Sequence, residues 1–198
     1  MRQIMFLLRT AAVVLTLTAS LAAASSPAAA ESQASDARLS AIREHAAKVQ
    51  ALIAEADKEA EGGGMPGFYC TEVFVNSRNG SWRAVGNYYQ KIAFWHTDQP
   101  EFAGEGKPEA SVLAKVEIQD GAAIRTSYRD YLFRDGRLVF AYIKEKSGDG
   151  PFEERRYYYD GGKLFRVQIG KDVKEQAPDA EVVREAAALQ ARFLALYR

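Results

Sequence analysis

Cys70, His96 and Asp98 are the residues whose types could carry nucleophilic catalysis. In that chemistry a histidine base lies within hydrogen-bond reach of the thiol that it activates. The turn dipeptide Asn79-Gly80 predicts a hairpin with a two-residue loop, which pairs Cys70 with Tyr89. His96 then lies further along the strand, roughly 20 Å away at about 3.3 Å per residue. The sequence therefore predicts that the pair does not form, and that Cys70 is a half-buried structural residue.

The other candidate groups favour a structural role. His45 could act as a base with Glu44 or bind a metal, but a single histidine beside an apolar helix stripe is typical of packing. Two histidines and one cysteine, far apart in the sequence, do not have the spacing of metal ligands. The acidic loop lacks the closely spaced oxygen ligands of a calcium loop; its residues are Asp149, Glu153 and Glu154. We predict no catalytic residue, no metal site and no cofactor.

The segment Arg155-Arg156-Tyr157-Tyr158-Tyr159 interleaves basic and aromatic side chains. Platforms for single-stranded nucleic acid combine the same residue types, but a flat ring with a polar tip also suits a saccharide or a peptide. Side chains alternate across a strand, so Tyr157 and Tyr159 share one side and Tyr158 lies on the other. We expect one set in the core, and take Tyr157 and Tyr159 as the candidate binding residues.

Residues 1–30 have the pattern of a signal peptide. Arg2 and Arg9 precede an apolar run over Ala11–Ala24, and small residues between Ala24 and Ala30 offer cleavage sites. The apolar run is shorter than the about 20 residues that span a bilayer. The sequence predicts an exported soluble protein, periplasmic or secreted, without stable membrane insertion.

Removal of the first 30 of the 198 residues leaves 168, which suits one domain with one core. This portion, 31–198, has 24 basic and 26 acidic residues, a net charge of −2. The balance gives no reason to expect nucleic acid or an anionic membrane as a partner. A single cysteine excludes an internal disulfide.

Two amphipathic helices are predicted, over 36–61 and 179–197, with a glycine-rich linker at 62–67. Apolar residues recur in steps of three and four on one stripe of each helix. The first stripe is Leu39, Ile42, Ala46, Val49, Ile53, Ala56 and Ala60, and the second is Val182, Ala186, Leu189, Phe193 and Leu196. Either stripe could join two chains, but packing on a sheet of the same domain is the commoner arrangement.

Between the helices, residues 68–170 alternate apolar and polar side chains and are punctuated by turn dipeptides. About seven strands in sequential hairpins predict an antiparallel meander. The strand over 82–96 is long enough to need a bend, which we place at Gly86-Asn87. At Asp120-Gly121 a three-residue loop is expected, which sets Ile118 opposite Ile124.

The sequence thus predicts an α+β fold: an N-terminal helix, a meander of about seven curved strands, and a C-terminal helix packed on the sheet. No motif names a family. The favoured function is non-enzymatic binding of a small amphipathic molecule between the sheet and a helix, where pockets commonly form. The alternative is a structural or interaction protein of the cell envelope that forms a homodimer through a helix stripe. A hydrolase is the third and least favoured hypothesis.

Overall fold

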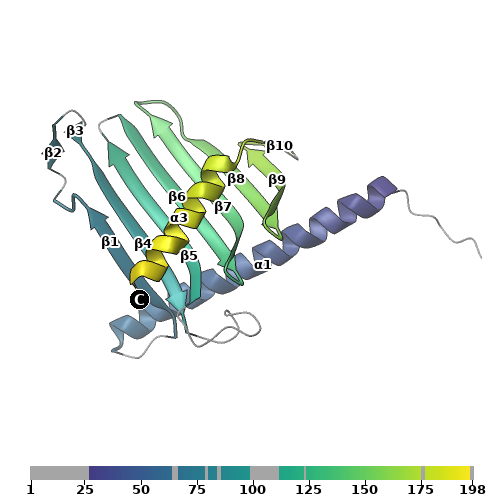
Figure 1. Ribbon diagram of the computed structural model, residues 1–198, viewed down its shortest axis with the longest axis horizontal. Coiled ribbons are helices and arrows are strands. Elements are labelled where there is room, and N and C mark those ends of the chain that lie inside the picture. The colour runs from purple at the N-terminus through teal and green to yellow at the C-terminus, as the bar shows by residue number, and fades with distance from the viewer. Residues whose placement is uncertain are drawn as a thin grey trace, which may run out of the picture.

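The computed structural model describes residues 27–63, 67–78, 80–83, 86–98, 112–122, 124–174 and 177–196. An antiparallel sheet of eight strands lies between two helices (Figure 1). Its strands, in spatial order, are β1 (Tyr69–Val75), β4 (Tyr89–Thr97), β5 (Val112–Ala122), β6 (Arg125–Arg134), β7 (Arg137–Ser147), β8 (Glu153–Asp160), β9 (Lys163–Ile169) and β10 (Asp172–Lys174). Within those ranges, neither helix has the length and apolarity that a membrane crossing requires.

The predicted α+β class, with a helix at each end of an antiparallel meander, is confirmed. Helix α1 (Pro27–Glu61) ends where the sequence predicts but begins nine residues before the expected Asp36. Helix α3 (Ala180–Leu196) agrees with the predicted 179–197 within one residue at each end. The signal-peptide interpretation rests on residues 1–30, and 1–26 are outside the described ranges.

The two helices cover opposite faces of the sheet, and each buries most of its predicted stripe; the last residue of each stripe, Ala60 in α1 and Leu196 in α3, is exposed. Helix α3 lies diagonally across one face (Figure 1) and packs Val182, Ala186, Leu189 and Phe193 on it. Helix α1 packs on strand residues that include Leu132 of β6. The stripe of α1 is buried through Leu39, Ile42, Val49, Ile53 and Ala56.

Burial on both faces explains three runs of three consecutive buried strand residues, at 92–94, 131–133 and 157–159. Tyr131, Leu132 and Phe133 are one such run; Leu132 belongs to the α1 core and its two neighbours belong to the α3 core. The tyrosines at 157–159 divide in the same way, with the central ring on the α1 side. Alternation along a strand sends successive side chains to opposite faces, so a run of this kind requires a cover on each side.

The register of the meander agrees with the sequence where turns are short. Arg134 pairs with Arg137 across Asp135-Gly136, and positive φ at both turn residues matches the tight hairpin turn that their types predict. The expected Asp120-Gly121 turn is wrong. Strand β5 continues through it to Ala122, which pairs with Arg125, so Ile118 lies opposite Arg129 rather than Ile124.

The predicted first hairpin is also wrong in register. Residues 82–96 do not form one strand, because β2 (Ser81–Trp82) and β3 (Gly86–Asn87) pair with each other as a separate small ribbon. Strand β4 therefore returns beside β1 later in the sequence, and Cys70 pairs with Trp95 instead of Tyr89. A small hairpin inserted in the loop lengthens the connection, which dipeptide chemistry alone does not reveal.

Two histidines join the helices to the sheet. His45 of α1 donates Nε2–H to the Phe133 carbonyl at 2.9 Å. The His96 ring of β4 lies 5.2 Å from the Phe193 ring of α3, and its Nε2 is 3.2 Å from Thr71 Oγ1. Burial lowers the pKa of both imidazoles below their usual 6.5. For His45 the positive charge of Arg134 lowers the pKa further.

We expect Phe193→Ala to lower the free energy of unfolding by about 3–5 kcal/mol, because a buried phenylalanine is replaced by a cavity. Phe193 is 2% exposed and projects from α3 onto the sheet, against Phe94 and His96. Urea unfolding followed by circular dichroism measures the change. Leu194→Ala is the matched control, since this neighbour is 47% exposed, and it should cost about 0.5 kcal/mol or less. Equal losses in both variants would contradict the packing of α3 on the sheet.

We also expect the protein to lose stability as the pH falls below 6.5. Each histidine has a lower pKa in the folded chain than in the unfolded chain, so the unfolded chain binds more protons in this range and acid favours it. In His45→Gln an amide replaces the titrating ring and can still donate to Phe133. The slope of unfolding free energy against pH, between pH 6.5 and about 5, should then be smaller. Identical slopes would show that His45 does not contribute.

Candidate functional site

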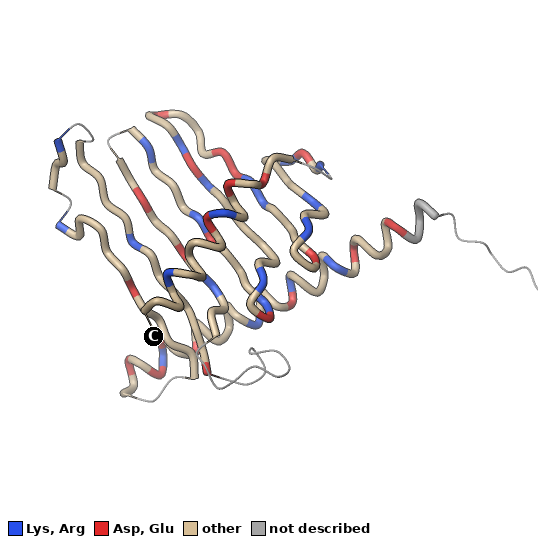
Figure 2. The backbone as a smooth tube through the Cα atoms, in the orientation of Figure 1, with Lys and Arg blue, Asp and Glu red and all other residues tan. Residues whose placement is uncertain are grey.

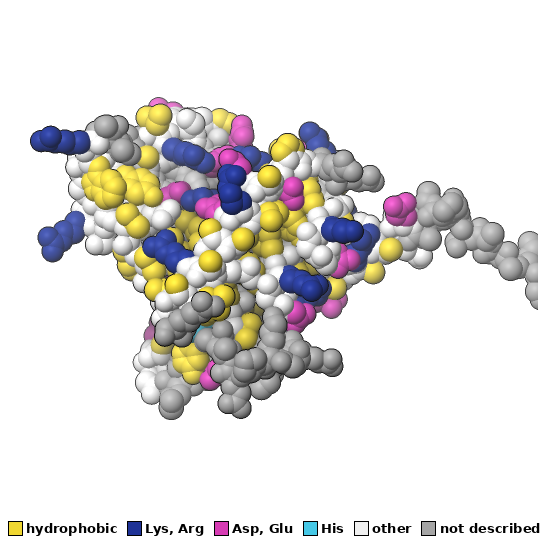
Figure 3. All heavy atoms as spheres, in the orientation of Figure 1, with side chains coloured by type: hydrophobic (Ala, Val, Ile, Leu, Met, Phe, Trp, Pro, Cys, Tyr) yellow, Lys and Arg dark blue, Asp and Glu magenta, His cyan; other side chains and the backbone are white. Residues whose placement is uncertain are grey.

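A cavity of about 320 Å³ lies between the beginning of α3 and strands β6, β7 and β8. One part of its wall is apolar, formed by Ile143, Tyr157, Pro178, Ala180 and Val182. The other part is charged, formed by Arg125, Arg129, Glu145, Arg155, Glu181 and Glu185. Acidic and basic residues lie on neighbouring strands at this end of the sheet (Figure 2), and Figure 3 shows charged side chains gathered beside α3. The wall thus offers both apolar and ionic contacts to one ligand.

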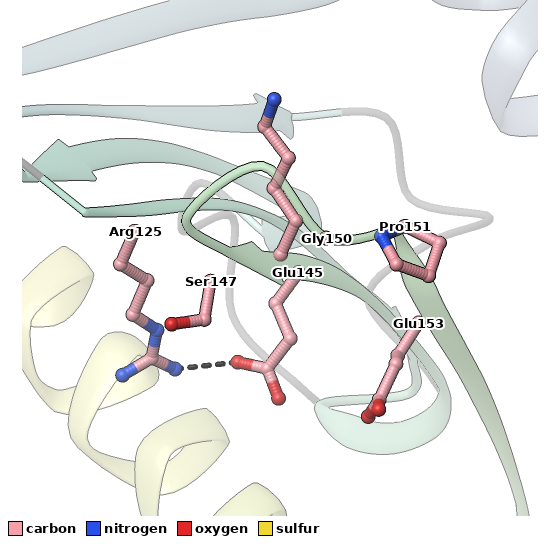
Figure 4. A pocket seen from close by; sticks show the side chains of 7 residues that line it. Arg125, Glu145, Ser147, Gly150, Pro151 and Glu153 are labelled. Atoms are coloured by element: carbon pink, nitrogen blue, oxygen red, sulfur yellow. Dashed lines mark hydrogen bonds and ion pairs between the residues drawn. The ribbon is translucent and has the colours of Figure 1, made fainter.

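A second cavity, of about 470 Å³, adjoins the first at the turn between β7 and β8. Both cavities are lined by Arg125 and Glu145 (Figure 4), and Gly150, Pro151 and Glu153 close the far side of the second. The shared pair makes the two spaces neighbours on the same face of the sheet. The charged residues between them therefore face a larger space than either cavity alone.

Glu145 of β7 is held by arginines from the strands on either side. Its Oε2 accepts a hydrogen bond from Arg125 Nη2 at 2.5 Å, drawn as a dashed line in Figure 4. Its Oε1 forms an ion pair with Arg155 Nη2. Two guanidinium groups thus share one carboxylate, which leaves one positive charge in excess among these three side chains.

Arg129 of β6 is instead fully matched by carboxylates. Its Nη2 lies 2.6 Å from Asp120 Oδ2 on β5, and its Nη1 bonds Glu185 on α3. The other oxygen of Glu185 accepts a hydrogen bond from the hydroxyl of Tyr131. Burial opposes the charge of Arg129, but Glu185 and Asp120 raise its pKa above the ordinary value. Through these bonds the network joins α3 to two strands of the sheet.

Three buried donors beside the cavity have no hydrogen-bond partner within the described residues: Ser127 Oγ, Arg129 Nε and Arg155 Nε. Ser127 is 1% exposed. It lies between Arg125 and Arg129 on β6 and directly opposite Glu145 on β7. A buried donor without a partner is costly and uncommon in native proteins. The cluster therefore leaves three donors at this end of the sheet that acceptor oxygens of a ligand could satisfy.

The predicted binding residues lie in the core beneath α3. Tyr157 and Tyr159 are 4% and 1% exposed and share one face, while Tyr158 faces α1. Of the two, Tyr157 lines the cavity. Tyr159 lies deeper, and its burial and the charge of Asp179 raise its pKa above the usual value. These two rings therefore do not form an exposed aromatic platform. Of the two, Tyr157 is the ring that borders the cavity.

Cys70 and His96 are much closer than the sequence suggests, yet they do not face each other. The register places His96 opposite Tyr69, next to the pair of Cys70 and Trp95. His96 points to the α3 side, where it contacts Thr71 and Phe193. Alternation sends the thiol to the other face. The predicted separation is therefore wrong, while the sheet itself keeps thiol and imidazole apart.

A third concavity, of about 240 Å³, lies on the sheet face that α1 leaves open, and is lined by acids and two aromatic rings. Its lining includes Glu72, Glu117, Asp130, Trp95 and Tyr128. Lys115 forms ion pairs with Glu117 and Asp130, and Trp95 donates its indole N–H to Glu117 at 3.3 Å. Burial raises the pKa of Asp130 despite the charge of Lys115.

Within the ranges that the structure describes, no group of three or more histidine, cysteine, aspartate or glutamate side chains is arranged to hold a metal ion. Comparison with protein-family models, curated proteins and solved structures gave no match to this chain. The site is therefore interpreted from its own geometry.

Sequence reasoning missed the charged wall of the cavity, although a signal for it is present. Arg129 and Arg155 each precede a buried tyrosine by two positions, and Glu145 follows Ile143 by two. In a strand, residues two apart share a face, so these charges occupy core-facing positions. A charge in such a position requires a partner or a cavity.

We expect Cys70 to react with iodoacetamide about a hundredfold more slowly at pH 8 in the folded protein than after denaturation. Cys70 is exposed rather than half-buried as predicted, but the burial it has and the charge of Glu72 still raise the pKa of the thiol to about 11, and only the thiolate is nucleophilic. The rate should increase about tenfold per pH unit up to that value. Mass spectrometry of timed samples measures it. A folded protein that reacts at the denatured rate would show an activated thiol and revive the nucleophile hypothesis.

Proposed function

We propose that the protein is an exported binding module, which holds a small amphipathic molecule in the cavity between α3 and the sheet. One observation carries the proposal: the wall is apolar along Ile143, Tyr157 and Val182 and ionic along the arginines and glutamates beside them. A volume of about 320 Å³ falls in the range of small-molecule sites. The signal-peptide pattern of residues 1–30, with Arg2 and Arg9 before an apolar run and small residues after it, supports export.

Binding is favoured over catalysis by the arrangement of the reactive groups. Cys70 and His96 lie on opposite faces of the sheet, and nucleophilic catalysis requires them in contact. The homodimer alternative gains no support, because both helix stripes pack on the sheet of their own chain. A binding module therefore remains the function that agrees best with the geometry.

The first test is native mass spectrometry of the protein after expression with its own N-terminal segment in an exporting host. We expect a mature chain that begins between Ala24 and Ala30, with extra mass that disappears on denaturation. Calorimetric titration with decanoate and with decanol then tests binding of ten-carbon amphiphiles directly. Absence of both the extra mass and any binding of these two molecules would overturn the proposal.

The place where the ligand binds is tested by Ala180→Trp, because Ala180 lines the cavity at the first turn of α3 and is exposed. The indole should fill part of the cavity and weaken binding of the better amphiphile at least tenfold. Ala187→Trp is the matched control, since it adds the same ring to an exposed position of the same helix. Equal affinity in the two variants would place the ligand elsewhere.

A further inference from the structure

The charge around Glu145 specifies the kind of ligand further. Arg125 and Arg155 each use an Nη2 atom on this one carboxylate. For neither guanidinium does the described part of the chain provide a second carboxylate. Arg129, two positions after Ser127, has two carboxylates of its own. The cavity wall as a whole has three arginines and three glutamates, so the excess positive charge is local and lies at Arg125 and Arg155, which share the single carboxylate of Glu145.

The unpaired donors lie at the same place. Ser127 Oγ, opposite Glu145, and Arg155 Nε are buried and make no hydrogen bond within the described residues. These groups donate hydrogen bonds, so acceptor oxygens would satisfy them. The first turn of α3 also borders the cavity at Ala180, Glu181 and Val182, and the positive end of the helix dipole favours an anion there.

Glu145 shows which chemical group the two arginines accept. Its carboxylate already bridges strands β6 and β8 by bonding Arg125 and Arg155, one through each oxygen. Guanidinium groups match the planar, two-oxygen shape of a carboxylate. A ligand carboxylate would meet the same two side chains, and Glu145 would compete with it and repel it.

We infer that the ligand is a carboxylic acid with an apolar body, whose carboxylate binds Arg125 and Arg155 beside Ser127 while its body lies along Ile143, Tyr157 and Val182. This inference rests on the proposed function and names its ligand class. Glu145 acts as an internal competitor, which neutralises the arginines while the site is free. Binding therefore depends on charge at one end of the cavity and on apolar area at the other.

The test compares decanoate with decanol, which share a ten-carbon chain and differ in the acid group. We expect decanoate to bind at least tenfold more tightly at neutral pH and low salt, with the difference decreasing as salt is added. Arg125→Gln should remove most of the difference. Its side chain is 63% exposed, so this variant removes a charge with little disturbance of the core. Arg155→Gln should act in the same direction.

Glu145→Gln is the decisive variant. Because it removes the competing carboxylate and keeps the shape, it should tighten decanoate binding about tenfold and leave decanol binding unchanged. Glu154→Gln is the matched control: it removes the same charge from the neighbouring strand β8, but Glu154 lies on the opposite face of the sheet from Glu145, where it pairs with Arg156. This control should leave both affinities unchanged.

The outcomes separate the two proposals. If decanoate and decanol bind alike and Glu145→Gln changes neither, the acid-binding inference is overturned while the amphiphile site stands. If decanoate is preferred but the arginine and Glu145 variants have no effect, the carboxylate binds elsewhere and the inference also falls. If neither molecule binds, and native mass spectrometry shows no extra mass, the proposed function itself fails.

Discussion

The structure depends on one constraint: near one end, the sheet is apolar on both faces, so a helix must cover each. Strand β6 shows it most directly, because Tyr131 and Phe133 are buried beneath α3 and Leu132 beneath α1. Without either helix, a row of large side chains would be exposed to water, and burial of apolar area is the main favourable term in folding. This requirement explains why the two helices, one before and one after the strands, occupy opposite faces of one sheet.

The same constraint places the candidate site. Helix α3 runs diagonally, so its later turns bury Leu189 and Phe193, while its first turns meet strand positions occupied by arginine and glutamate. There the helix is held by Glu185, which forms an ion pair with Arg129 and accepts a hydrogen bond from the hydroxyl of Tyr131. Charged side chains of different lengths pack less completely than apolar ones, and the cavity lies where the core changes from apolar to ionic contacts. Anchoring of the helix and formation of the cavity are thus two results of one network.

Local patterns predicted the elements well, but non-local pairing only in part. The helix stripes and the Asp135-Gly136 hairpin follow from residues close in sequence, and all are found. The pairing of β1 with β4 is different, because a separate ribbon, β2 with β3, occupies part of the connection. A turn dipeptide fixes register only when the strands beside it pair with each other. Asn79-Gly80 precedes that ribbon, so the inferred partner of Cys70 was six residues from the true one, Trp95.

The site was less predictable than the fold because its members come from three strands and a helix. Glu145 receives one arginine from β6 and another from β8, and only the complete meander brings these strands to its two sides. The tyrosine triplet was conspicuous in the sequence, yet most of its ring area serves the cores. Conspicuous aromatic runs in strands indicate a sheet with two covered faces. A charged side chain two positions from a buried strand residue is a more specific sign of a site than an aromatic run. Such a charge faces the core, which is tolerated only where it has a partner or borders a cavity.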